Sequence, residues 1–242
     1  MKKRVIAFSM ITFLLTFPSA RAIHIQGVED AGIVLTKEIE MELGSHYERW
    51  KKDENQTTAQ LVFTCGLHNR LNGILEIPYL ILHQGESKNS GFGDLNIGIK
   101  YRFSEEQNLA PALALKALGT LPMGDKSRDL GAGEMGYGLT AVASKTWGKC
   151  ETHLNLCFGR DLSSYGLSLW YPQKRFTFVA ELTGECSSWF KDLPGSSGLL
   201  LGTFYELTGD VLVDLGINWR LRGEIAKHIF FLGCTFTIDN QK

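Results

Sequence analysis

The sequence predicts an all-β fold, a closed antiparallel transmembrane β-barrel of about twelve strands with short periplasmic turns and longer extracellular loops. Three observations predict this fold class. Apolar and polar residues alternate with a period of two from Thr36 to the end of the chain, which is typical of strands. Short and long connections follow one another between these segments. An export signal precedes them, and no later stretch is apolar enough for a membrane helix.

The first element is a predicted signal peptide, residues 1–22. Lys2–Arg4 form its basic end, Val5–Phe17 its apolar stretch, and Ala20–Ala22 a small-x-small cleavage site. An uncleaved anchor is the alternative, but the apolar stretch falls short of the ~20 residues of a spanning helix. Residues 23–242 contain no linker and are predicted to be one barrel domain in the bacterial outer membrane.

Twelve strands are predicted in order, because each stretch of alternating residues is bounded by turn-forming or polar residues. In 92–104, for example, Leu95, Ile97 and Ile99 share one face, while Lys100 and Arg102 lie on the other. An even number places both chain ends on the periplasmic side. The predicted ranges are 36–48, 57–68, 72–83, 92–104, 109–121, 134–147, 150–160, 165–171, 175–184, 198–207, 211–222 and 227–238.

The connections assign the two rims. Those after the even-numbered strands are short: Asn69–Leu71, Glu105–Asn108, Gly148–Lys149, Pro172–Lys174 and Thr208–Asp210. Most of those on the other rim are predicted to be longer, more polar loops: Arg49–Gln56, Gln84–Gly91, Pro122–Gly133 and Glu185–Ser197. Asp161–Ser164 is a short exception. This segregation is typical of a membrane barrel, whereas a soluble secreted barrel or sandwich, the alternative fold, gives no reason for it.

The two faces of each strand assign the lumen. A charge in hydrocarbon is costly, so the apolar set is predicted to face lipid and the mixed set the lumen. The predicted lumen-lining residues are Glu76, Lys100, Arg102, Lys116, His153, Glu181 and Asp214. Glu76, on the strand before, is the candidate partner of Lys100. Two interpretations remain open, a salt-bridged plug that stiffens the barrel and a selectivity surface for a polar or anionic solute. Leu200 and Phe204 on the same face would add apolar patches to the lumen.

Chemical motifs are sparse. The five cysteines have no metal-ligand spacing and are interpreted as small wall residues, with disulfides as the alternative. Neither a cofactor motif nor a phosphate-binding loop is recognised, and a net charge of −1 gives no reason to expect nucleic acid. Ser144 could approach His153 from the neighbouring strand, as acyl hydrolysis would require. A histidine satisfied within the lumen is the simpler interpretation.

Two motifs carry a family resemblance. Gly91, Gly93 and Asp94 open a strand that bears Lys100 six residues later, and Leu121-Pro122-Met123-Gly124-Asp125 follows the next strand. Together they resemble outer-membrane proteins labelled phenol-degradation MetA-pathway or transporter-like barrels, in which threonine usually stands where this chain has Met123. The resemblance implies a barrel that moves small, often hydrophobic molecules, and it transfers no catalytic or ligand residues.

The functional prediction follows from this resemblance and the mixed lumen. We expect a passive channel or transporter for small hydrophobic or aromatic molecules, with outer-membrane lipid and such a solute as partners. We expect no cofactor and no enzymatic activity. The alternative is a structural or adhesive surface barrel with a closed lumen, and a barrel hydrolase is the third hypothesis.

Overall fold

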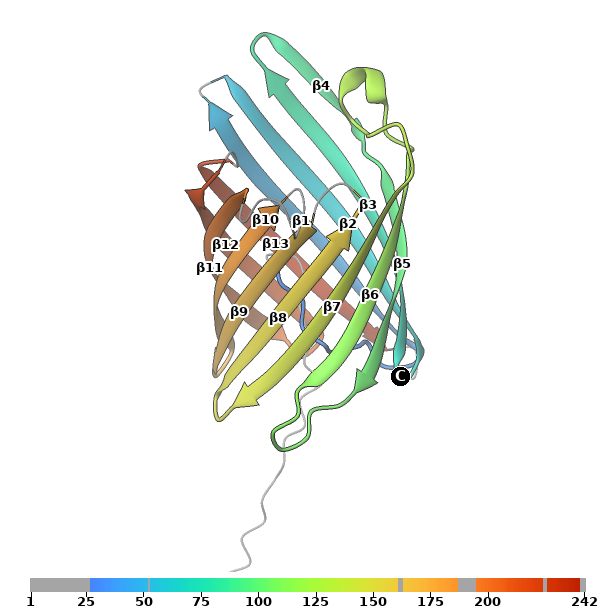
Figure 1. Ribbon diagram of the computed structural model, residues 1–242, viewed down its shortest axis with the longest axis vertical. Helices are drawn as coiled ribbons and strands as arrows, with labels where there is room; N and C mark the ends of the chain where they lie inside the picture. The colour runs from blue at the N-terminus through green and yellow to red at the C-terminus, as the bar shows by residue number, and fades with distance from the viewer. Residues whose placement is uncertain (1–26, 52, 161–162, 187–194, 224–225, 240–242) are drawn as a thin grey trace, which may run out of the picture.

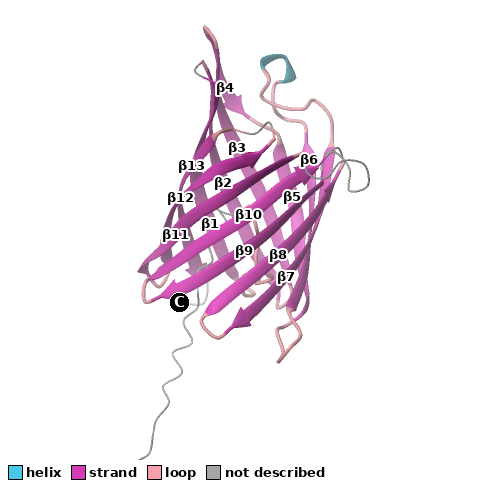
Figure 2. Ribbon diagram, turned by 60° about the vertical axis from the view of Figure 1, so that its left-hand side comes forward, coloured by secondary structure: helices cyan, strands magenta, loops and turns pink. Residues whose placement is uncertain are grey.

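The structure, a computed structural model, describes residues 27–51, 53–160, 163–186, 195–223 and 226–239; the predicted signal peptide 1–22 lies outside them. The described residues form one antiparallel sheet that curls into a barrel (Figures 1 and 2). Its strands are β1 (Glu38–Lys51), β2 (Glu54–His68), β3 (Leu71–Gln84), β4 (Ser87–Phe92), β5 (Leu95–Ser104), β6 (Ala112–Leu121), β7 (Gly136–Trp147), β8 (Cys150–Gly159), β9 (Ser163–Gln173), β10 (Phe176–Cys186), β11 (Ser196–Thr208), β12 (Val211–Arg222) and β13 (His228–Asp239).

The barrel closes between its first and last strands. β1 pairs with β13 from Glu38↔Asp239 to Arg49↔His228, and its other edge pairs with β2. β4 and β5 both pair with β3, one after the other along its length. The wall is therefore a closed barrel of twelve strands plus one extra strand, and the predicted fold class is confirmed. Closure satisfies the backbone hydrogen bonds that lipid leaves without partners.

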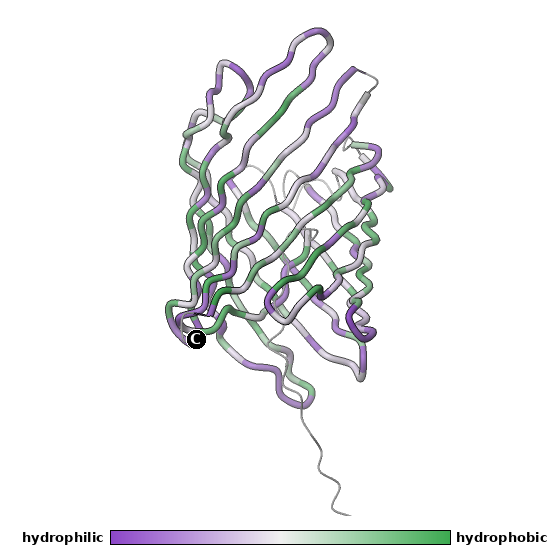
Figure 3. The backbone as a smooth tube through the Cα atoms, turned by 180° about the vertical axis from the view of Figure 1, so that it is seen from behind, coloured by the Kyte–Doolittle hydropathy of each residue, from purple (hydrophilic) through white to green (hydrophobic). Residues whose placement is uncertain are grey.

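Two predicted extracellular loops are wrong. The segment predicted as the loop Gln84–Gly91 is a tight turn at Gly85 and Glu86 followed by β4. Likewise, β1 continues to Lys51 and β2 begins at Glu54, inside the predicted loop Arg49–Gln56. These hairpins extend beyond the rest of the wall, and their residues are mostly hydrophilic (Figures 1 and 3). Outside the membrane both faces of a hairpin contact water, so backbone pairing continues where the apolar alternation has stopped.

The bounds of several other strands also differ from the prediction. The predicted strand 92–104 is divided at Gly93 and Asp94. β4 pairs with β3 up to Phe92↔Tyr79 and β5 pairs with it from Asn96↔Glu76, so residues 93–95 lie opposite only residues 77 and 78, and the Gly93 N–H donates to the Pro78 carbonyl (2.9 Å). β6 begins at Ala112 rather than residue 109, and β9 extends beyond the predicted 165–171 at both ends. The loop between β6 and β7 contains the short 3-10 helix η1 (Lys126–Arg128), visible above the rim in Figure 2.

The outer surface of the wall is apolar. Leu43, Ile99, Phe178 and Leu215 each expose between 49% and 59% of their area, as expected for side chains that face lipid. Figure 3 shows the apolar residues gathered in the part of the barrel below the protruding hairpins. No helix among the described residues is long and apolar enough to cross a membrane. Cys65, Cys150, Cys157 and Cys234 are free thiols.

Candidate functional site: the barrel lumen

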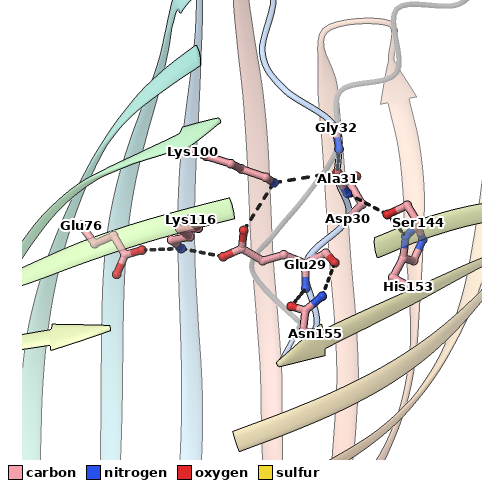
Figure 4. A network of polar contacts seen from close by, with 10 residues as sticks. All are labelled: Glu29, Asp30, Ala31, Gly32, Glu76, Lys100, Lys116, Ser144, His153 and Asn155. Atoms are coloured by element: carbon pink, nitrogen blue, oxygen red, sulfur yellow. Dashed lines mark hydrogen bonds and ion pairs between the residues drawn. The ribbon is translucent and has the colours of Figure 1, made fainter. Parts of the chain in front are cut away.

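The lumen contains a stretch of the chain itself. Residues 27–35, here called the N-terminal segment, cross the barrel before β1 begins (Figures 1 and 4). At one end the Gly27 N–H donates to Glu181 on β10 (3.0 Å). In the middle the Ala31 N–H donates to Ser144 Oγ on β7 (2.7 Å). The segment lies before the first strand, with Gly27 eleven residues ahead of Glu38. The alternation of apolar and polar residues in the strands therefore does not predict it.

Glu29 of this segment lies between two lysines. Lys100 on β5 and Lys116 on β6 are directly opposite each other in the strand register, and both are almost fully buried. Glu29 Oε1 accepts from Lys116 Nζ at 2.6 Å, while Oε2 lies 3.3 Å from Lys100 Nζ. Asp30 adds a longer contact to Lys100 at 4.0 Å. Two like charges facing each other inside a protein repel strongly, and the Glu29 carboxylate between them removes that repulsion.

Amide side chains of the wall hold the segment by its backbone. Asn155 on β8 accepts from the Glu29 N–H and donates to the Glu29 carbonyl, both at 2.7 Å. Asn72 on β3 makes the same pair of bonds with Val34 when its amide nitrogen is turned toward the Val34 carbonyl (3.0 and 2.8 Å). Both amides are buried. The wall therefore recognises the extended backbone of the segment as well as its charges.

Two glycines of the wall make room for the segment. A Cβ atom at Gly66 would lie 1.9 Å from the Leu35 carbonyl oxygen, and one at Gly166 would lie 2.4 Å from Val28 Cγ2. Val28 is fully buried in this position. The close approach of segment and wall thus depends on glycine at both ends of the crossing.

One predicted pairing is wrong. Glu76 was the expected partner of Lys100, but it pairs with Lys116 (3.1 Å) and accepts from Asn96 Nδ2 (3.0 Å). The register explains the difference, because β3 places Asn72, not Glu76, opposite Lys100. The charged side chains of β3, β5 and β6 therefore form one buried cluster with the N-terminal segment. In it Glu29 connects the two lysines, and Glu76 binds Lys116 (Figure 4).

The other predicted lumen residues lie at several depths. Arg102 is near the periplasmic rim and pairs with Glu105 at 2.9 Å. His153 is 1% exposed, and its Nδ1 is 2.8 Å from Ser144 Oγ. Glu181 accepts from Ser168 Oγ at 3.1 Å in addition to Gly27. Asp214 is buried opposite Gly233, and within the described residues neither of its carboxylate oxygens has a hydrogen-bond partner.

Ser144 is bound on two sides. Its Oγ accepts the Ala31 N–H and lies within hydrogen-bond distance of His153 Nδ1. The His153 ring also packs against the Trp170 ring, with the ring centroids 4.3 Å apart. The pair therefore contributes to fixing the N-terminal segment against β7. Among the described residues no group of three or more histidine, cysteine, aspartate or glutamate side chains is arranged to hold a metal ion.

An apolar wall lies on β9, β10 and β11. Trp170, Val179, Leu200 and Phe204 form a buried cluster there, each at most 5% exposed, with the Trp170 and Phe204 rings edge to face at 5.4 Å. Trp170 Nε1 donates to Ser168 Oγ (2.8 Å), which in turn donates to Glu181. The interior therefore holds a packed apolar cluster on one side and the lysine–carboxylate cluster of β3, β5 and β6 on another.

Residues 28–164 match the protein family described as "Putative MetA-pathway of phenol degradation". The chain belongs to this family. No curated protein matches the chain. Among solved structures it is similar to the COG4313 outer membrane channel from Pseudomonas putida F1, with 12% identity, a TM-score of 0.63, and coverage of 86% of this chain and 98% of that one. The NanC porin is similar at 10% identity and a TM-score of 0.58, covering 81% of this chain and 98% of the porin.

A third similar structure is the KdgM porin in complex with disordered oligogalacturonate, at 10% identity and a TM-score of 0.57, with coverage of 82% and 98%. These likenesses concern the fold. The chain is an outer-membrane β-barrel, as the sequence predicts.

The motifs that carry the family resemblance form a clamp at the extracellular end. The Asp94 carboxylate accepts the Gly124 N–H (2.9 Å) and the Ala132 N–H (2.7 Å) from the loop between β6 and β7. A Cβ at Gly124 would lie 2.2 Å from the Leu130 carbonyl oxygen, so the motif glycine permits the close return of the loop. Because the loop folds back on itself, Leu130 is buried and lies near Gly91 and Gly93. The motifs thus position an extracellular loop beside β4 and β5.

This clamp gives a first prediction. Asp94→Ala is expected to release the loop, because both backbone N–H groups lose a charged acceptor, each such bond contributing about 1.5–3 kcal/mol. Limited trypsin digestion of the barrel in detergent should then cut after Lys126 and Arg128 at least several times faster than in the unchanged protein. Asp125→Asn, which alters bonds inside the loop to the N–H and hydroxyl of Ser127, is the control. Equal cutting of Asp94→Ala and the unchanged protein would contradict the clamp.

Proposed function

We propose that the barrel is a passive channel for small hydrophobic or aromatic molecules, with the N-terminal segment as its constriction. The observation that carries this proposal is the apolar wall of Trp170, Val179, Leu200 and Phe204 inside a barrel that also holds a charged cluster. An amphipathic or aromatic solute finds both apolar contact and polar partners along such a path. The family description and the channels and porins of similar fold support the same class of function.

The test uses ion current through the barrel in planar bilayers. Phenol added to the bath should interrupt the current for longer than erythritol at the same concentration, because its ring can rest on the apolar wall. Phe204→Ser, which removes a buried ring from this wall, is expected to shorten the phenol interruptions. Phe178→Ser, on the lipid-facing side of β10, is the control and should leave them unchanged. Interruptions that do not distinguish phenol from erythritol would contradict the proposed solute class.

A structural or adhesive surface barrel with a closed lumen is the second candidate function. The crossing of the lumen by the N-terminal segment and the protruding hairpins β1–β2 and β3–β4 favour it. Absence of current from the unchanged protein and from a variant that loses Glu29 would support this second candidate. Current from either would support the channel.

A further inference from the structure

The N-terminal segment, residues 27–35, is held in the lumen much as a protein holds a separate peptide (Figure 4). Its hydrogen bonds to the wall between Gly27 and Val34 all involve side chains of the wall. Among the backbone–backbone hydrogen bonds that join described residues outside the strands, none comes from residues 27–34. The segment therefore adds no strand to the sheet, and the barrel closes without it.

Polar side chains of the wall bind the backbone of the segment along its length. Side chains on β8, β7 and β3 bind the backbone of residues 29, 31 and 34, respectively. Backbone N–H and carbonyl groups are the same in nearly every residue. These bonds therefore hold an extended chain whatever its sequence, as a peptide-binding groove does.

Two positions of the segment favour small residues. A Cβ atom at Gly27 would lie 2.9 Å from Thr183 Cγ2, closer than real Cβ contacts. Ala31 is 1% exposed and packs in a buried cluster with Ala114 and Val142. A larger side chain at either position requires the wall to move, because protein interiors are close-packed.

The two positions between them select particular side chains. Val28 is fully buried over Gly166, which leaves the space that its side chain fills. Glu29 connects the two facing lysines of β5 and β6. Among the described residues of the wall, these lysines have Glu76 as their one carboxylate partner. The groove without its segment therefore carries an excess positive charge that selects an acidic ligand.

A turn at the periplasmic rim connects the segment to β1. Lys37 has a φ of 75°, in the left-handed region that turns often use, and its N–H donates to the Gly66 carbonyl (3.2 Å). The Thr36 hydroxyl donates to Asn69 Oδ1 (2.7 Å) in the turn between β2 and β3. The segment can thus leave the groove about this turn while every strand pairing of the wall stays intact.

We propose that the lumen is a binding groove for one extended acidic peptide, and that the N-terminal segment fills it as an exchangeable ligand. The peptide that fits has a small residue, a valine, two acidic residues and a second small residue, in that order. The inference goes beyond the proposed channel function, because recognition of a peptide by the wall does not depend on the passage of a solute.

The binding test uses a full-length variant whose own segment no longer fits. Val28→Ser, Glu29→Ala and Ala31→Gln together remove the buried valine, the carboxylate and the small side chain. A fluorescent peptide with the sequence of residues 27–36 is titrated against this variant in detergent at low ionic strength, with anisotropy as the readout. The peptide is expected to bind, and added salt should weaken the binding because it screens the attraction to the lysines.

A matched peptide and two wall variants show which contacts matter. The same peptide with Glu29→Gln should bind roughly tenfold more weakly, as expected for the loss of one charge-assisted hydrogen bond. Asn155→Ala in the wall should weaken binding several-fold, because two bonds to the peptide backbone are lost. Thr235→Val should leave binding unchanged, since Thr235 is buried on β13 and has no hydrogen bond among the described residues. Equal binding of the two peptides would overturn the groove.

Exchange is tested in a barrel that keeps its segment. Val28→Cys, in a background free of the native cysteines, places a thiol at a fully buried position. An excess of the unlabelled peptide should occupy the groove whenever the segment leaves it, and should speed the reaction of this thiol with a water-soluble maleimide several-fold. A reaction rate that the peptide does not change would contradict exchange. Peptide binding by a barrel that passes no current would support the groove and count against the proposed channel.

Discussion

Glu29→Ala is expected to release the N-terminal segment from the lumen and to destabilise the barrel. The substitution leaves Lys100 and Lys116 facing each other across β5 and β6 without the carboxylate between them. Removing one partner of a buried ion pair costs about 3–5 kcal/mol, and here two lysines lose the same partner. Lys116 keeps its contact with Glu76 at 3.1 Å, whereas Lys100 keeps the longer contact with Asp30 at 4.0 Å.

The free energy of unfolding in urea, followed by heat-modifiable gel migration, measures the loss of stability. Conductance in planar bilayers measures the release, since a displaced segment should increase the single-channel current. Glu105→Gln is the matched control, because its partner Arg102 lies near the rim and the Glu105 side chain is 66% exposed. Exposed ion pairs of this kind contribute about 0–1 kcal/mol. Equal effects of the two substitutions would show that Glu29 does not hold the segment.

Ile99→Lys is expected to have the second large effect. Ile99 is 49% exposed on the outer face of β5, while the next residue, Lys100, is 3% exposed inside the barrel. A lysine on the lipid face costs about 2–4 kcal/mol at the bilayer midplane and less near the interfaces. Ile99→Val should be nearly neutral. The measurement is the free energy of unfolding in lipid vesicles, and a tolerated lysine at 99 would mean that β5 faces the other way.

Cysteine labelling checks the same orientation without relying on stability. In a background free of the native cysteines, positions 97 and 99 should react with a lipid-soluble maleimide. Positions 96 and 102, on the inner face, should react with a small water-soluble one. Position 98 is unsuitable, because a Cβ at Gly98 would lie 2.2 Å from the Ala117 carbonyl oxygen. The opposite labelling pattern would exchange inside and outside for the whole barrel.

The sequence by itself determined the closed barrel and its approximate strand positions. A period of two is a local property of each strand, so Leu95, Ile97 and Ile99 reveal their shared face without knowledge of their neighbours. For the same reason the inward set that includes Lys100, Lys116 and Glu181 could be named in advance, and the structure places these side chains in the interior. The extracellular hairpins were not predicted, because strands that contact water on both faces need no alternation of apolar and polar residues.

Only the tertiary structure decided what occupies the lumen. Glu29 and Asp30 lie before the first strand, and nothing local distinguishes them from a solvated leader. One signal was available in principle, since the strand pattern placed both Lys100 and Lys116 on the inner face and offered a specific carboxylate partner, Glu76, for Lys100 alone. Their common partner depends on the register of β5 and β6 and on Glu29, which lies 71 residues before Lys100 and 87 before Lys116 in the chain. Pairings of that kind are set by long-range packing and charge neutralisation, which residue order does not encode locally.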